Sequence, residues 1–244
     1  PMVIHGTTLH QVGGFRVAVY ACRGGRAPDL DNFELLEQLG RFVARIHLVG
    51  ATARFRHRPG IDVESEAIES MDSLLEHDFI PVELLPAYES VAQNVIDGVE
   101  ASFDRAGDAM QLRIHGDFHP GNVLVAGEQL HIVDFDDTRS GPAVQDLWMF
   151  LSGDRAEQLP QLSALLDGYT QFRDFDAREL HLVEALRSLR IMHYAAWLAR
   201  RWDDPAFKHA FPWFDSHRYW EDHVLALREQ LSLMQEEPLE WRPY

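Results

Sequence analysis

Hydrophobic residues recur every three or four positions over most of the chain, which is the spacing of amphipathic helices. The pattern is clearest in the segment 32–47, where the apolar positions are Leu36, Leu39, Val43 and Ile46. Asp31 is a suitable N-cap for this helix. The same criteria predict further helices over about 64–76, 82–103, 143–151, 156–173, 177–201 and 217–235. The stretch 202–216 is rich in Pro, Trp and Phe, and we expect it to form an ordered loop.

Two segments follow the alternation of β-strands instead. In the first, within residues 1–24, the alternating apolar positions are Phe15, Val17, Val19 and Ala21. Two glycines precede them, which predicts a hairpin. The second, 112–137, predicts a strand, a polar loop, a strand, a turn and a third strand. A short β segment followed by helices with one β insertion is typical of an α+β protein.

Composition narrows the class of protein. The chain has 244 residues, of which 46% are hydrophobic and 25% charged, enough for one large core or two small ones. Its net charge of −17 argues against a nucleic-acid partner, which would need a basic face. No apolar run approaches the roughly 20 residues of a transmembrane helix, no secretory signal is present, and Cys22 has no second cysteine to pair with. We therefore expect a cytoplasmic protein without a membrane partner.

The polar loop of the β insertion contains the candidate chemistry. Its sequence over residues 115–122, His-Gly-Asp-Phe-His-Pro-Gly-Asn, presents Asp117 and then Asn122, and the third strand ends at Asp134. Phosphoryl transfer from Mg-ATP needs a carboxylate for the attacking hydroxyl and two hard oxygen ligands for the metal. We therefore predict that Asp117 is the catalytic base and that Asn122 and Asp134 bind Mg²⁺. Each residue alone is explained as well by a turn or a strand-end cap, but their joint spacing favours phosphoryl transfer.

Several neighbours of this motif receive weaker assignments. His115 and His119 are expected to hold the backbone of the loop. Asp136 and Asp137 either assist the metal or face water. Asp146 lies in an apolar segment, so we expect a buried carboxylate that accepts hydrogen bonds from N–H groups of the 115–122 loop.

Aromatic residues are frequent in the last third of the chain: Tyr194, Trp197, Trp202, Trp213 and Trp220. Most of them are explained as packing of a helix face or a loop, although an acceptor pocket among them remains open. A different interpretation of the motif is a dinuclear metal centre of a hydrolase, with the ligands His115, Asp117, His119 and Asp134. That interpretation leaves Asn122 unexplained.

The 115–122 motif, together with Ile-Val-Asp-Phe-Asp-Asp over 132–137, resembles the aminoglycoside phosphotransferase and choline kinase superfamily of protein-kinase-like enzymes. Further resemblance to bacterial kinases of the stress response type runs across nearly the whole chain. It implies an ATP- and Mg²⁺-dependent phosphotransferase that acts on serine or threonine hydroxyls of proteins, or on itself. By motif position it implies Asp117 as catalytic, Asn122 as a magnesium ligand, and Asp134 as both a ligand and an active-site residue.

The chain departs from this superfamily at its amino end. Protein kinases have a strand lysine and a glycine-rich loop that hold the nucleotide phosphates, whereas the only lysine here is Lys208. We therefore expect residues 1–24 to be a residual N-lobe hairpin and hinge, residues 25–244 to be the helical C-lobe, and the rest of the N-lobe to be absent. Such a fragment is expected to bind ATP poorly, to be inactive alone, and to dimerise through its exposed hinge face.

Two other functions stay open at this point. One is a kinase of small molecules, with a homoserine, choline-like or aminoglycoside acceptor and the same machinery. The other is a kinase-like module without catalysis. The missing lysine favours the module, whereas the intact set of Asp117, Asn122 and Asp134 favours an enzyme.

Overall fold

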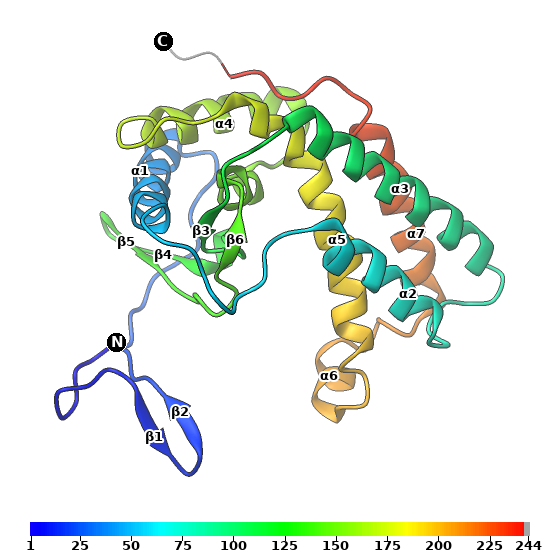
Figure 1. The fold of residues 1–244 in the computed structure, drawn as a ribbon, viewed down its shortest axis with the longest axis horizontal. Helices are drawn as coiled ribbons and strands as arrows, with labels where there is room; N and C mark the ends of the chain where they lie inside the picture. The colour runs from blue at the N-terminus through cyan, green and yellow to red at the C-terminus, as the bar shows by residue number, and fades with distance from the viewer. Residues whose placement is uncertain (242–244) are drawn as a thin grey trace.

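Helices form most of the body of the protein in the computed structural model, which describes residues 1–241 (Figure 1). The helices are α1 (Phe33–Gly50), α2 (Glu69–Leu75), α3 (Leu85–Ala106), α4 (Arg155–Tyr169), α5 (Val183–Ala199), α6 (Pro205–Ala210) and α7 (His217–Leu233). The strands are β1 (His10–Val12), β2 (Phe15–Val17), β3 (Leu112–Ile114), β4 (Val123–Ala126), β5 (Gln129–Ile132) and β6 (Arg139–Gly141). They form the antiparallel pairs β1–β2, β3–β6 and β4–β5. The α+β class predicted from the sequence is confirmed.

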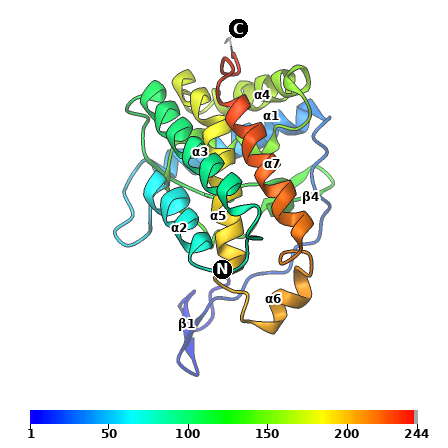
Figure 2. The same ribbon diagram turned by 90° about the vertical axis from the view of Figure 1, so that its right-hand side faces the viewer.

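The helices form two groups on either side of β3 and β6 (Figure 1). In the first group, α1 packs along α4 at Gly40 and Gly168. A Cβ atom on either glycine would lie 1.9 Å from a carbonyl oxygen of the partner helix, so only glycine allows this close approach. In the second group α5 contacts α2, α3 and α7, and Figure 2 shows α3 and α7 side by side. The β insertion therefore lies where the two groups meet.

The hairpin of β1 and β2 projects away from the helices (Figure 1). His10 pairs with Val17 and Val12 with Phe15, so the predicted hairpin is confirmed. Its apolar side chains have little cover, and Phe15 is 75% exposed. The chain returns to the body at Arg26, whose backbone exchanges two hydrogen bonds with Val125 of β4.

Three predicted elements differ from the structure. The N-cap of α1 is Asn32 rather than Asp31, because the Asn32 side chain accepts a hydrogen bond from the Leu35 N–H at 3.1 Å. The segment 143–151 is buried, as predicted, but it forms two 3-10 turns instead of an α-helix. The predicted loop 202–216 contains α6, which begins at a capping Asp204 followed by a proline.

The remaining helices were predicted with shifted ends. The region 64–76 begins with a π-helical turn, Glu64–Ile68, before α2, and the region 177–201 begins with a 3-10 turn, Ala177–Leu182, before α5. The β insertion has the predicted order up to β5, and β6 then returns to pair with β3. Among the described residues, no helix is both long and apolar enough to cross a membrane.

Candidate active site

Asp117 lies in the 115–122 loop, which leaves β3 and ends in the 3-10 turn Pro120–Asn122. Its Oδ1 forms an ion pair with the Arg190 guanidinium of α5. Its Oδ2 lies 3.5 Å from His119 Nε2, and its main-chain carbonyl accepts a hydrogen bond from Asn122 Nδ2 at 2.9 Å. The carboxylate is thus held from two sides, yet the side chain remains 23% exposed.

The inner side of the loop is held by Asp146, whose side chain is 1% exposed. Its Oδ2 accepts hydrogen bonds from the His115 N–H at 2.7 Å and from His47 Nε2 at 2.9 Å, and its Oδ1 accepts one from the Gly116 N–H at 2.9 Å. The other nitrogen of His47 lies 3.0 Å from the Tyr169 hydroxyl oxygen. The predicted role of Asp146 as a buried support for the loop is confirmed.

Gly116 adopts a backbone conformation that other residues avoid, with φ of +87°. A Cβ atom at this position would lie 2.4 Å from the Asp137 carbonyl oxygen. The Gly116 carbonyl in turn accepts a hydrogen bond from Gln145 Nε2 at 2.9 Å, while Gln145 Oε1 accepts one from Trp148 Nε1 at 3.1 Å. These contacts fix the backbone on which Asp117 is presented.

Asn122 and Asp134 are brought together by the β4–β5 ladder. Val123 pairs with Ile132, and beyond this pair the Val133 N–H donates to the Asn122 carbonyl at 3.0 Å. Asp134, which follows directly, has φ of +62°, a rare conformation for a residue with a Cβ atom. In the described part of the chain, no hydrogen bond or ion pair engages the Asp134 carboxylate or Asn122 Oδ1. Two unpaired hard oxygens that flank one end of the β4–β5 pair are of the ligand type that Mg²⁺ prefers.

His119 binds the backbone of the loop, as predicted, whereas His115 binds the backbone just after β5. His115 Nε2 donates to the Val133 carbonyl at 2.9 Å, and His119 Nδ1 accepts from the Gly121 N–H at 3.0 Å. Within residues 1–241, no three His, Cys, Asp or Glu side chains converge on a point that would hold a metal ion. The structure therefore does not support a dinuclear metal centre with His115, Asp117, His119 and Asp134 as its ligands.

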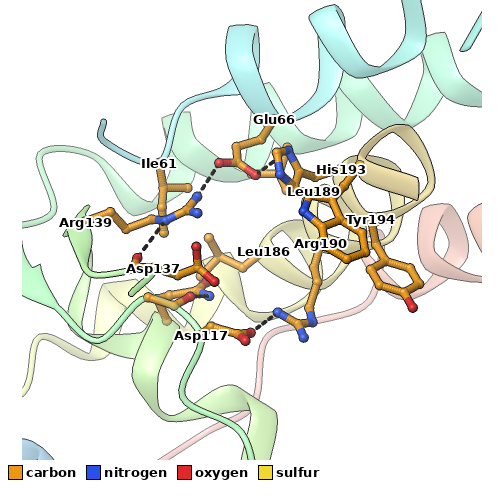
Figure 3. Close-up of a pocket in the computed structure, with 13 residues that line it drawn as sticks. Ile61, Glu66, Asp117, Asp137, Arg139, Leu186, Leu189, Arg190, His193 and Tyr194 are labelled. Atoms are coloured by element: carbon orange, nitrogen blue, oxygen red, sulfur yellow. Dashed lines mark hydrogen bonds and ion pairs between the residues drawn. The ribbon is translucent and has the colours of Figure 1, made fainter. Parts of the chain in front are cut away.

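A cavity of about 260 Å³ opens beside Asp117 (Figure 3). Its polar lining consists of Glu66, Gly116, Asp117, Asp137, Arg139, Gln145, Arg190 and His193. Its apolar lining consists of Ile61, Leu186, Leu189, Tyr194 and Trp197. One wall is therefore α5, and the opposite wall is the 115–122 loop with the segment before β6.

Glu66 links three sides of this cavity (Figure 3). Its carboxylate forms an ion pair with Arg139 of β6 and lies 3.2 Å from His193 Nδ1 of α5. Burial lowers the pKa of His193, and this effect outweighs the attraction of the Glu66 charge for a proton. Burial in this cavity therefore disfavours the protonated form of His193.

The sequence alone does not predict several of the residues that line the cavity. Arg190, Glu66 and Arg139 belong to three elements far apart in the chain, and no spacing rule relates them. Tyr194 and Trp197 were interpreted mainly as packing of a helix face, but they stack with their ring centres 5.8 Å apart and line the cavity. A cavity is therefore present among these aromatic residues, where the sequence left an acceptor pocket open.

A buried acid supports the site from behind. Glu179 accepts a hydrogen bond from the Val144 N–H at 2.8 Å, at the start of the 3-10 turn Ala143–Asp146 that positions Asp146. Burial raises the pKa of Glu179 to about 7, although hydrogen bonds from Val144 and Ala143 act in the opposite direction. The support of the loop therefore contains a group that titrates near neutral pH.

The loop with Asp117 and Asn122, the strand-end Asp134 and the helical body define a protein-kinase-like phosphotransferase fold. The chain belongs to the phosphotransferase enzyme family, whose model matches residues 1–183. It is 40% identical over 243 residues to stress response kinase A of Escherichia coli (strain K12), a match that covers the whole chain and 73% of that relative. It is 37% identical, with the same coverage, to the serine/threonine protein kinase RdoA of Salmonella typhimurium (strain LT2).

Solved structures with low sequence identity share the fold. The amicoumacin kinase hAmiN, in complex with AMP-PNP, Ca²⁺ and amicoumacin, superposes with a TM-score of 0.62 at 18% identity, over 91% of this chain and 70% of that one. A choline/ethanolamine kinase family protein from Mesorhizobium loti gives a TM-score of 0.57 at 18% identity, over 91% and 78% of the two chains. The resemblance to the aminoglycoside phosphotransferase and choline kinase superfamily is confirmed.

Proposed function

We propose that the protein is an ATP- and Mg²⁺-dependent kinase that phosphorylates serine or threonine hydroxyls of proteins. The observation that carries this proposal is the Asp117 carboxylate, which lines a cavity and lies on the same loop as Asn122, whose backbone bonds that of Val133 directly before Asp134. The volume of about 260 Å³ lies below the roughly 300–1,000 Å³ of pockets that enclose a drug-sized ligand. A protein hydroxyl as the acceptor is supported by the 37% identical relative that is named a serine/threonine protein kinase.

The proposed chemistry assigns one role to each oxygen group. Asp117 orients the acceptor hydroxyl and accepts its proton while the acceptor oxygen bonds to the γ-phosphorus and the bond to the departing ADP oxygen breaks. Arg190 and His119 hold the carboxylate in place for this step. Asn122 Oδ1 and Asp134 would hold magnesium, which when bound neutralises charge on the phosphates. Asp137 lines the cavity and is available to the acceptor.

We further propose that residues 25–244 act as the acceptor-binding and catalytic half of the kinase, with residues 1–24 as a hairpin and hinge. Residues 1–114 contain no lysine, and Lys208 lies on α6. Residues 1–244 alone are therefore expected to turn over ATP well below the roughly 1–100 per second of kinases. A rate in that range from residues 1–244 alone would overturn this part of the proposal.

The acceptor class is tested by supplying γ-labelled ATP and Mg²⁺ to the protein that contains residues 1–244. The acceptors are the protein itself, a generic protein substrate, and small alcohols such as choline, homoserine and an aminoglycoside. We expect label on serine or threonine of proteins. Label confined to the small alcohols would replace the protein acceptor by a small-molecule one, and no transfer to any acceptor would overturn the kinase assignment.

A further inference from the structure

The connection between α1 and α2 has an unusual charge for this protein. The whole chain contains 39 acidic and 22 basic residues, not counting histidine. Between Glu37 and Asp62, however, the sequence contains no aspartate or glutamate. Four of the seven basic residues of this stretch, counting histidine, lie close together near its end: Arg54, Arg56, His57 and Arg58. We call residues 54–58 the basic segment.

The side chains of the basic segment are available to a partner. Arg54, Arg56, His57 and Arg58 are all exposed. Arg58 donates to the carbonyl oxygens of Asp136 and Thr138, which are uncharged acceptors. Within residues 1–241, no ion pair engages an arginine of the segment. Their charges are therefore not neutralised by the protein itself.

The basic segment is anchored at the edge of the cavity. The Ser140 N–H donates to the Pro59 carbonyl at 3.1 Å, and the Ile61 N–H donates to the Ser140 carbonyl at 2.9 Å. Ile61 and Arg139 both line the cavity (Figure 3). Because an extended chain advances by at most about 3.6 Å per residue, Arg58 lies within about 11 Å of Ile61 and Arg54 within about 25 Å.

We propose that the basic segment docks an acidic stretch of the protein acceptor, within about seven residues of the phosphorylated serine or threonine. The figure of seven residues is the largest separation of Arg54 from Ile61 at the cavity edge, about 25 Å, divided by the rise of an extended peptide. This proposal rests on the proposed function, since it names the kind of protein that the same site phosphorylates. Acidic residues more than about 8 Å from the basic segment do not oppose such docking strongly, because charges at that separation are largely screened at physiological ionic strength.

The test compares three peptides that share a central serine and differ only in their flanks, which carry glutamate, glutamine or lysine. They are phosphorylated by the protein that contains residues 1–244. We expect kcat/KM for the glutamate peptide to exceed that for the glutamine peptide at least tenfold, mainly through KM. In the double variant Arg54→Ala/Arg56→Ala this ratio is expected to fall below about threefold, while kcat and the reaction of the glutamine peptide stay unchanged.

Arg228→Ala serves as the matched control, because Arg228 is exposed on α7. It is expected to keep the full preference for glutamate. Equal use of the three peptides, or a preference that survives in the double variant, overturns the docking proposal and leaves the kinase assignment intact. The docking proposal is also overturned if the double variant has a raised KM for ATP with every peptide, because the basic segment would then bind the nucleotide.

A binding measurement keeps the two proposals separable if no peptide is phosphorylated. The glutamate peptide with alanine in place of serine carries a fluorophore, and its anisotropy reports binding without catalysis. Binding that weakens at least fivefold in the double variant and with added salt supports docking. Binding that is equal in both proteins, or absent in both, contradicts it.

Discussion

On its inner side, the 115–122 loop is held by Asp146, which is buried and accepts three hydrogen bonds. On its outer side, Asp134 and Asn122 Oδ1 have no partner in the described part of the chain, and Asp117 is partly exposed. The same residue type thus has two uses around one loop. Asp146 accepts from buried N–H groups and fixes the backbone, whereas Asp134 has no partner among the described residues and Asp117, held by two side chains, remains accessible to an external group. Substitutions on the inner side should therefore reduce stability, and those on the outer side should reduce activity.

The largest effect on stability is expected for Asp146→Ala. The change leaves two backbone N–H groups and His47 Nε2 without their acceptor inside the protein. Loss of one member of a buried charged network costs about 3–5 kcal/mol. Urea denaturation should show this loss, whereas Asp203→Ala, at an exposed position, should change the free energy of unfolding by less than about 0.5 kcal/mol. A loss of unfolding free energy as small as that of the control would contradict the distinction between a structural inner side and a functional outer side of the loop.

The next effect is expected for Gly116→Ala. The new side chain meets both an unfavourable φ of +87° and the Asp137 carbonyl oxygen, 2.4 Å from the Cβ position. Backbone strain alone costs about 1–3 kcal/mol, and the clash should displace Asp117 as well. Gly127→Ala is the matched control, because Gly127 has φ of +61° and no atom within 4 Å of a Cβ. In Gly116→Ala we expect both the unfolding temperature and kcat to fall. In Gly127→Ala we expect a slightly lower unfolding temperature and an unchanged kcat.

A pH-dependent effect of similar or smaller size is expected at Glu179. Its pKa in the folded protein, about 7, lies above the ordinary value of 4.5. The protonated form is favoured by folding, so this contribution to stability is fully present below pH 4.5 and is lost as the pH rises through 7. Between pH 5 and pH 8 we expect the stability of Glu179→Gln to gain about 2 kcal/mol relative to the unmodified protein. Glu229→Gln, at an exposed position, should show no such trend in the same denaturation series.

The smallest of these effects is expected for Arg190→Ala. The Arg190 side chain is 43% exposed and pairs with Asp117, so its loss should change the free energy of unfolding by less than about 1 kcal/mol. The freed carboxylate loses its orientation, and we expect kcat/KM to fall about tenfold. Arg190→Lys should restore part of this loss. An unchanged kcat/KM in Arg190→Ala would show that the ion pair does not position Asp117.

The parts of the site that the sequence predicts are those set by local order. Asp117, Asn122 and Asp134 fall on one loop and its adjoining strands, so their spacing alone indicates that they meet. Arg190 and Glu66 come from α5 and the π-helical turn before α2, and only tertiary packing brings them to the cavity. A single sequence shows that Arg190 and Glu66 are charged, but not which distant residues they contact.

The fold shows the same limit. The segment 143–151 is apolar apart from Gln145 and Asp146, which favours a buried helix when only the sequence pattern is considered. In the structure the Val144 N–H is taken by Glu179 and the Asp146 side chain turns to the 115–122 loop, so the backbone adopts 3-10 turns. For α6, by contrast, the cap Asp204 and the following proline were visible in the sequence.

The central claim is that the outer carboxylates perform phosphoryl transfer on a scaffold that does not need them. The most direct measurement compares phosphotransfer from labelled ATP and thermal unfolding in Asp117→Asn and in Glu128→Gln, an exposed control in the β4–β5 turn. We predict that Asp117→Asn lowers the transfer rate by about 10²–10⁴-fold with an unchanged unfolding temperature, and that Glu128→Gln changes neither. Full transfer activity in a folded Asp117→Asn protein would contradict the account.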